Sequence, residues 1–301
     1  MYRGRALRSW AAVLVCALAL AGCGLGATTR PAALAGATPS LAAPAQPRPM
    51  TTPDATPTPD ATPTPWNLPA GSLYLNPASG REEVIDPSVG RTAVLIGDSQ
   101  SSGAAGVKGA DTWVERGLSA QGYAVRFVGA GGIGFAARTS KAANYPDGVE
   151  SGKTRLPFGN PALVVVQGGG NDATRGVPDA VILANAARLV KDLKASYPTS
   201  KFLFIGTLAK GAGHGGGRRT QVDGLLAGFA QRNGLEFISV GDWLSRYGVA
   251  GSLADAVHLD ASGHQVLARV LAGRLETLGL RGPGSPNAPG PGTRTAGHAI
   301  P

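Results

Sequence analysis

Cysteine is scarce in this sequence, and the positions of the cysteines limit what can hold the fold together. Among the 301 residues, only Cys16 and Cys23 are cysteines. Cys16 falls inside an N-terminal apolar run, from Trp10 to Leu20, of the kind that is removed from exported proteins. The mature chain would then keep one cysteine, which excludes an intramolecular disulfide. A disulfide-stapled secreted domain is therefore not expected.

The same N-terminus lacks an apolar run long enough to cross a bilayer, which takes roughly 20 residues. It has instead the parts of an export signal: Arg3, Arg5 and Arg8, the apolar run, and then Leu20-Ala21-Gly22-Cys23, which resembles a bacterial lipobox. We predict that residues 1–22 are a lipoprotein signal peptide. Lipid on Cys23 would anchor an extracytoplasmic protein to the cell membrane. The alternative is an ordinary cleaved secretory signal in which Cys23 is incidental.

Aromatic residues are also few, at 6% of the sequence, and the basic residues are spread along the chain. The formal net charge is +9, but three arginines would leave with the signal peptide. Surfaces that bind nucleic acid combine a basic stripe with aromatic residues on which bases stack. The sequence has no such stripe. We therefore expect no nucleic-acid partner, and we expect a monomer.

Patterns that hold cofactors are absent as well. Glycine-dense stretches occur at 129–134 and 211–217. Neither is followed by the Lys-Ser/Thr of a phosphate-binding loop, and no full dinucleotide fingerprint fits. No group of cysteine, histidine and aspartate residues has the spacing of metal ligands. The sequence therefore predicts no cofactor and no metal.

Large apolar side chains are nearly missing from about residue 27 to residue 69, where proline recurs. Such a segment cannot bury enough apolar surface to offset its ordering entropy, and its prolines favour an extended spacer. We divide the rest of the chain on the same grounds. Residues 23–70 are predicted to be a disordered Pro/Thr/Ala-rich linker, 71–90 a linker or N-terminal arm, 91–280 one folded domain, and 281–301 a disordered tail.

Short β-rich runs and helical patterns alternate through the predicted domain. The runs cover residues 92–96, 125–128, 163–167, 202–205 and 236–240. The helical patterns cover residues 111–121, 179–196, 220–233 and 261–278. Continuous apolar runs of this length are typical of strands that are buried on both faces in a parallel sheet. We predict an α/β fold whose ligands bind beyond the carboxyl ends of the strands.

Two motifs directly follow predicted strands and so fall on that edge of the sheet. Ser99, in Gly97-Asp98-Ser99, is a candidate nucleophile, although a loop serine can equally cap the next helix. Asn171, in Gly169-Gly170-Asn171-Asp172, offers neutral N–H donors to a developing oxyanion. The alternative for Asn171 and Asp172 is an Asx turn, in which both only bond their own backbone.

A third motif, Asp255-Ala256-Val257-His258, precedes the last predicted helix. In a turn, this spacing lets the carboxylate bond one imidazole nitrogen while the other nitrogen faces a nucleophile. The alternative is a capping aspartate beside a surface histidine, but Asp260 is the better cap candidate. We expect His264, His298 and His214 to be non-catalytic.

In this order the motifs resemble the blocks of the SGNH (GDSL-like) hydrolase superfamily, over about residues 91–280. The resemblance implies a flavodoxin-like three-layer α/β/α sandwich with about five parallel strands. It also implies that Ser99 is the nucleophile, His258 the base and Asp255 its orienting carboxylate. The oxyanion hole would combine the Ser99 amide, the Asn171 side chain and a glycine amide, which is that of Gly134 or, after a short slip in alignment, Gly132.

Two positions depart from the family pattern. Gln100 stands where the family name has leucine, and we expect it to reshape the entrance without removing catalysis. The glycine block, residues 129–134, lacks its usual leading asparagine.

The function that we predict is a serine esterase that hydrolyses acyl or acetyl esters of envelope glycans or lipids through an acyl-enzyme. One alternative is an O-acyltransferase, which shares the acyl-enzyme. Another is a non-catalytic envelope-binding module. We expect the long segment 136–160 to cover the active-site edge and to select the substrate.

Overall fold

The computed structural model describes residues 64–286. The predicted signal peptide, Cys23 and nearly all of the predicted linker lie outside the described residues, as does the tail from residue 287. Within the described part, no helix is both long and apolar enough to cross a membrane.

Five parallel strands form the main sheet, in the order β4-β3-β6-β7-β8, and this confirms the predicted fold class. Each of the five β-rich runs of the sequence forms one strand. Leu95 pairs with Phe127 on one side and Val165 on the other, so β3 lies inside the sheet. The strands are β3 (Thr92–Gly97), β4 (Ala124–Gly129), β6 (Leu163–Gln167), β7 (Lys201–Ile205) and β8 (Glu236–Ile238).

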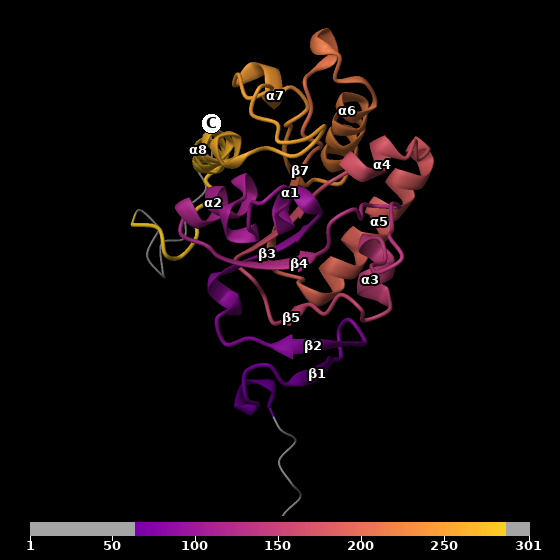
Figure 1. Ribbon diagram of the computed structural model, residues 1–301. Coiled ribbons are helices and arrows are strands. Elements are labelled where there is room, and N and C mark those ends of the chain that lie inside the picture. Colours follow the sequence, from indigo (N-terminus) through magenta and orange to yellow (C-terminus); the bar gives the residue numbers. More distant parts are fainter. Residues whose placement is uncertain (1–63, 287–301) are drawn as a thin grey trace, which may run out of the picture. The chain divides into compact units, whose positions relative to one another are not determined.

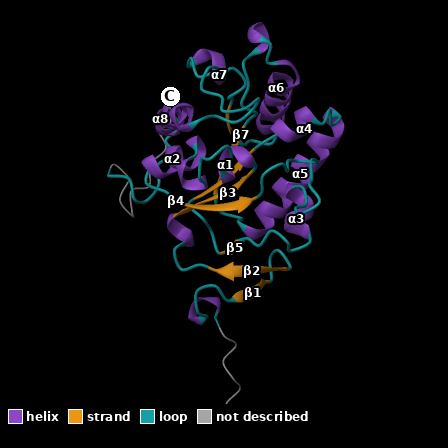
Figure 2. Ribbon diagram, viewed as in Figure 1, coloured by secondary structure: helices purple, strands orange, loops and turns teal. Residues whose placement is uncertain are grey.

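Helices cover both faces of this sheet, as Figure 2 shows. Side chains alternate across a strand, so Val94 and Ile96 pack on one face while Ala93 and Leu95 pack on the other. The first face is covered by α3 (Tyr145–Glu150), α5 (Asp179–Ser196) and α6 (Gly217–Arg232). The second face is covered by α2 (Trp113–Ala120), α7 (Trp243–Arg246) and α8 (Ala261–Thr277).

Residues 71–90, predicted to be a linker or arm, contain a hairpin. Strands β1 (Leu73–Asn76) and β2 (Arg81–Ile85) pair antiparallel, and β2 also pairs with β5 (Pro157–Phe158). The charged sequence of β2 does not show the apolar pattern of a strand, because one of its buried residues is Glu83. Glu83 accepts a hydrogen bond from Asn76 Nδ2 at 2.8 Å. The hairpin lies at the opposite end of the described part from α1 and α4 (Figure 1).

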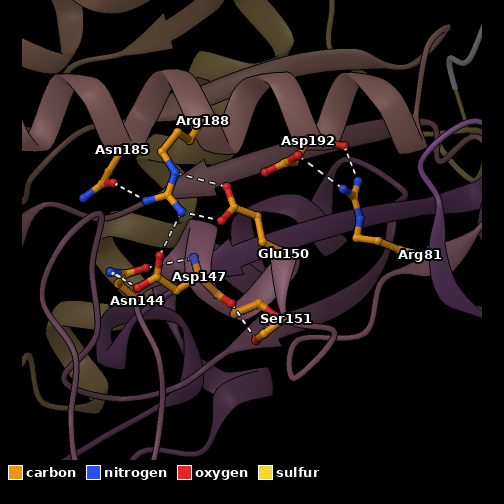
Figure 3. A network of polar contacts seen from close by, with 9 residues as sticks. Arg81, Asn144, Asp147, Glu150, Ser151, Asn185, Arg188 and Asp192 are labelled. Carbon is orange, nitrogen blue, oxygen red and sulfur yellow. Dashed lines mark hydrogen bonds and ion pairs between the residues drawn. The ribbon is translucent and has the colours of Figure 1, made fainter.

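Ion pairs on α5 hold both the hairpin and α3 (Figure 3). Arg81 of β2 reaches Asp192 of α5, with 3.2 Å between Nη1 and Oδ1. Arg188 of α5 pairs with Glu150 and, at 3.0 Å, with Asp147, both on α3. Helix α3 therefore lies against α5.

Candidate active site

Strand β3 delivers Ser99 to the carboxyl edge of the sheet. Ser99 is the first residue of α1 (Ser99–Ser102), and Asp98 caps this helix by accepting a hydrogen bond from Gln100 N at 2.9 Å. The helix cap is thus Asp98 and not Ser99. The Ser99 side chain is partly exposed, whereas Asp98 is buried. Burial raises the pKa of Asp98 from 3.8 to about 6, against the opposing effects of the Gln100 amide and the Arg219 charge.

A closed turn carries Asp255 and His258. An isolated bridge between Leu253 and Leu259 joins its two ends, and Ala254 N donates to His258 O at 2.8 Å. Within the turn, Asp255 Oδ1 accepts hydrogen bonds from the amides of Val257 and His258, at 2.8 and 2.7 Å. The backbone thus fixes the carboxylate next to the imidazole.

Ser99, His258 and Asp255 form one row of contacts, although Ser99 and His258 are 159 residues apart. His258 Nε2 lies 2.8 Å from Ser99 Oγ, and Nδ1 lies 2.7 Å from Asp255 Oδ2. The hydrogen bond from His258 and the two backbone amides lower the pKa of Asp255 to about 2. The carboxylate is therefore ionised at neutral pH, where it favours the tautomer with the proton on Nδ1. This arrangement is that of serine hydrolases.

Strand β6 delivers Asn171 to the same edge, in α4 (Gly170–Thr174). Asn171 Nδ2 donates to the Ile133 carbonyl at 2.9 Å and contacts Asp98 Oδ2 at 3.4 Å. Only the first of these distances is that of a good hydrogen bond. The side chain therefore joins the glycine loop after β4 to the end of β3, and its weaker contact leaves an N–H for a ligand.

Asp172 has a different place, because it is fully buried. Its carboxylate accepts three backbone hydrogen bonds, from Phe135 at 2.9 Å, Ala136 at 2.7 Å and Ala137 at 2.8 Å. The Asx-turn alternative does not describe this residue, since these partners lie more than 30 positions away. Asp172 instead fixes the loop that follows β4.

The structure does not support Gly134 as an oxyanion donor. Its only N–H donates to Ala137 O at 2.9 Å, inside the loop that Asp172 holds. A side chain at position 134 would collide with the Asp172 carboxylate, which explains the glycine. Gly131, in contrast, lies beside Ser99: a Cβ there would be 3.8 Å from Ser99 Cβ. The loop therefore approaches the serine at Gly131, next to Gly132.

Two further residues belong to this site: Arg219, which the sequence patterns did not single out, and Gln100, which they did. A pocket of about 110 Å³ beside Ser99 is lined in part by Arg219, from the first turn of α6. Gln100 is buried, and its Nε2 donates to Val257 O at 2.8 Å, next to His258. Gln100 thus supports the histidine turn from beneath. The only sequence feature that could have indicated Arg219 is its place in the segment that follows β7, on the same edge of the sheet.

The remaining histidines and segment 136–160 lie apart from this row. His264 is buried and accepts a hydrogen bond from Trp113 N at 2.9 Å, and burial lowers its pKa to about 4. His214 is exposed, and His298 lies outside the described residues. Within the described part of the chain, none of the residues that line the pocket beside Ser99 comes from segment 136–160, and α3 packs on α5. The expectation that this segment selects the substrate stays a prediction.

Comparisons with known proteins agree with this geometry. Residues 95–266, more than half of the chain, match the GDSL-like lipase/acylhydrolase family. The chain belongs to that family and is a serine ester hydrolase of the SGNH type. No curated protein sequence matches the chain.

Solved structures share its fold. A family two carbohydrate esterase from Clostridium thermocellum is 15% identical with a TM-score of 0.51, over 65% of this chain and 66% of that one. A member of the lipolytic G-D-S-L family from Veillonella parvula is 16% identical with a TM-score of 0.48, over 62% and 98%. A family two carbohydrate esterase from Cellvibrio japonicus is 18% identical with a TM-score of 0.48, over 66% and 64%.

Proposed function

We propose that Ser99 Oγ attacks the carbonyl carbon of an ester and that His258 Nε2 takes the hydroxyl proton. The observation that carries this proposal is the unbroken row from Ser99 Oγ through both nitrogens of His258 to Asp255. As the imidazole becomes charged, the ionised Asp255 stabilises it. His258 then gives the proton to the departing alcohol, which leaves an acyl-enzyme on Ser99. Water, deprotonated by His258, attacks the acyl group and releases the acid.

The negative charge that develops on the carbonyl oxygen requires donors that are already in place. We assign these to the Ser99 amide, the Gly132 amide and Asn171 Nδ2. The amides of Ser99 and Gly132 have no hydrogen-bond partner within residues 64–286. Asn171 Nδ2 has one strong partner, Ile133 O at 2.9 Å, and only a weak contact with Asp98 Oδ2 at 3.4 Å, which the oxyanion would replace.

The proposed substrate is an acetyl or other short acyl ester of an envelope glycan or lipid. The pocket beside Ser99, at about 110 Å³, is small compared with sites for larger ligands, which span roughly 300–1,000 Å³. Such a volume favours a short acyl group. Hydrolysis of p-nitrophenyl esters of two to twelve carbons tests this proposal: turnover is expected to fall steeply beyond four carbons. A preference for the long chains would contradict it.

A fluorophosphonate probe tests the nucleophile directly. We expect one equivalent of label on the Ser99 peptide, and none on the Ser99→Ala variant. The control is Ser101→Ala, which changes the next serine along the chain, whose buried Oγ donates to Gln167 Oε1 at 2.8 Å. Label on another residue, or a folded protein that the probe does not modify, would refute the assignment and favour a non-catalytic binding module.

The proposed location is the outer face of the cell membrane, with lipid on Cys23. The sequence Leu20-Ala21-Gly22-Cys23 behind an apolar run supports it. One acyl chain binds membranes only weakly, but two or more hold firmly. Mass spectrometry of the N-terminal peptide tests the anchor: a diacylglyceryl group on Cys23 is expected, and its loss together with membrane partitioning in Cys23→Ser. An unmodified N-terminus at another residue would rule out the anchor while leaving the esterase proposal intact.

A further inference from the structure

A second cavity adjoins the pocket beside Ser99. Its volume is about 200 Å³, and both Arg219 and Val257 line the two spaces. We call it the Arg219 cavity. Polar and apolar atoms line it about equally, and its only charged lining residues are two cations, Arg219 and the exposed Lys210. The other residues that line it are Leu208, Ala209, Gly215, Gly216, Leu244, Leu253, Ala256 and Val257.

The guanidinium of Arg219 is held in place but not neutralised. Its Nε donates to Leu208 O at 2.9 Å, and its Nη1 lies 3.3 Å from Gly170 O. Among residues 64–286, no carboxylate forms an ion pair with Arg219, and Nη2 has no hydrogen-bond partner. Burial lowers the pKa of Arg219, and the charge of Asp98, which forms no ion pair with it, acts in the opposite direction.

The neighbouring residue shows the contrast. Arg218, also in the first turn of α6, pairs with Asp179 and donates to Val177 O at 2.8 Å, and it lines neither space. Arg219 is also partly buried but forms no ion pair, since Asp98 acts on it only at longer range. It lines the pocket that contains the nucleophile.

We propose that the Arg219 cavity binds a negatively charged group, a carboxylate or phosphate, that belongs to the ester substrate. The inference rests on the proposed esterase function and adds a substrate class to it. A guanidinium presents donors in a fixed plane that suits these groups, and hydrogen bonds between charged partners are stronger than neutral ones. Lys210, at the rim, adds a second positive charge. The reactive carbonyl would lie at Ser99 with the anionic group in the adjoining cavity.

A purely structural role for Arg219 makes a different prediction. If the guanidinium only ties the Leu208 and Gly170 carbonyls together, its loss harms neutral and anionic substrates equally. The informative quantity is therefore the ratio of kcat/KM for an anionic ester to that for a neutral ester of the same shape. Any common loss, and any difference in leaving-group chemistry, cancels when this ratio is compared between variants.

Two ester pairs place the charge on either side of the reacting carbonyl. The pair p-nitrophenyl hemisuccinate and p-nitrophenyl butyrate tests the acyl side, and 4-acetoxybenzoate and 4-acetoxybenzamide test the alcohol side. We expect Arg219→Gln to lower the ratio by about 10- to 100-fold for one pair, which is the range for a hydrogen bond between charged groups. Arg218→Gln removes the same charge one residue away and should leave both ratios unchanged.

Unchanged ratios in Arg219→Gln for both pairs would overturn the inference while leaving the esterase intact. If the wild-type protein hydrolysed none of the four esters, the proposed function would fail instead. Binding then tests the cavity by itself. Calorimetry on the Ser99→Ala protein compares 4-acetoxybenzoate with 4-acetoxybenzamide, and p-nitrophenyl hemisuccinate with p-nitrophenyl butyrate. A preference for the anion that Arg219→Gln abolishes supports the cavity, and equal binding of anion and amide refutes it.

Discussion

The carboxylates at the active-site edge fall into two groups, one exposed and one buried, whose pKa values shift in opposite directions. Asp255 lies in an exposed turn, with 48% of its side chain accessible, and its pKa is lowered to about 2. Asp98, Asp172 and Asp223 lie beneath the loops and are buried. Burial raises the pKa of Asp98 and of Asp223. The difference lies in burial: both groups accept backbone amides, which lower the pKa, but desolvation outweighs them for Asp98 and Asp223, whereas Asp255 is exposed and also pairs with a histidine.

This division separates chemistry from positioning. Asp223 accepts the amides of Thr207 and Val240 and joins the loops after β7 and β8, just as Asp172 holds the loop after β4. A buried carboxylate is tolerated because amide donors replace the lost water. The exposed turn can give its carboxylate to His258 because the buried layer already fixes the loops around it.

The largest expected effects on activity are at the row of contacts formed by Ser99, His258 and Asp255. Ser99→Ala and His258→Ala should each lower kcat by about 10⁴-fold or more, because each removes a group that acts on the reacting atoms. The free energy of unfolding should change little, since both side chains are only partly buried. Steady-state kinetics and urea unfolding check this. The double variant should be no worse than either single one, and additive losses would contradict a joint role.

Asn171 has both a positioning and a proposed chemical role, because its side chain binds the glycine loop at Ile133 O and is assigned to the oxyanion. Asn171→Ala should lower kcat by about 10²–10³-fold with little change in KM, because the donor acts on the transition state. Asn185→Ala, on the outer surface of α5, is the matched control and should leave kcat unchanged. An effect on KM alone would make Asn171 a binding residue.

The buried group should show its effect in stability. Asp172→Ala leaves three buried amides without an acceptor, and each costs about 1–3 kcal/mol, so we expect a loss of at least about 3 kcal/mol in the free energy of unfolding. The exposed Asp242, 3.7 Å from Arg246, provides the control, and Asp242→Ala should cost well under about 1 kcal/mol. Equal losses in urea unfolding would remove the distinction between the two groups.

The raised pKa of Asp98 predicts a pH dependence of stability. Because the folded protein holds this proton more tightly than the unfolded chain, the stability contribution is complete below about pH 4 and is lost as the pH rises through about 6. Asp98→Asn should reduce that loss by about 2–3 kcal/mol. Urea unfolding at pH 4 and pH 7 measures it. Identical pH profiles in the two proteins would show that Asp98 is ionised without penalty.

The smallest expected effect concerns Gln100, which joins the buried layer to the exposed turn. Gln100→Leu removes its hydrogen bond to Val257 O, worth about 1 kcal/mol, and should lower kcat roughly fivefold by loosening the His258 turn. Gln121→Leu removes a similar bond, 2.9 Å to Ala272 O on α8, and serves as the control. A loss of stability without a change in kcat, as in the control, would mean that Gln100 is only structural.

Local patterns predicted most of the fold because they are set by burial. The five strands are apolar runs that lie inside a parallel sheet, and the predicted ranges match the observed strands to within two residues at each end. The hairpin of β1 and β2 was not predicted because it buries a charged residue, Glu83. The Glu83 carboxylate accepts hydrogen bonds from the side chains of Asn76 and Ser79. No periodicity of apolar residues reports such a strand.

The sequence by itself determined which edge of the sheet carries the site, because Ser99 and Asn171 directly follow predicted strands, and the family resemblance joined His258 to them. A parallel sheet brings the carboxyl ends of its strands together, so residues that directly follow strands must meet. Only the tertiary structure decided which backbone amides are free, that the Gly134 amide is occupied, and that Arg219 lines the pocket beside Ser99 without an ion pair. Those facts depend on where distant side chains such as Asp172 place the loops, and no local sequence pattern records such contacts.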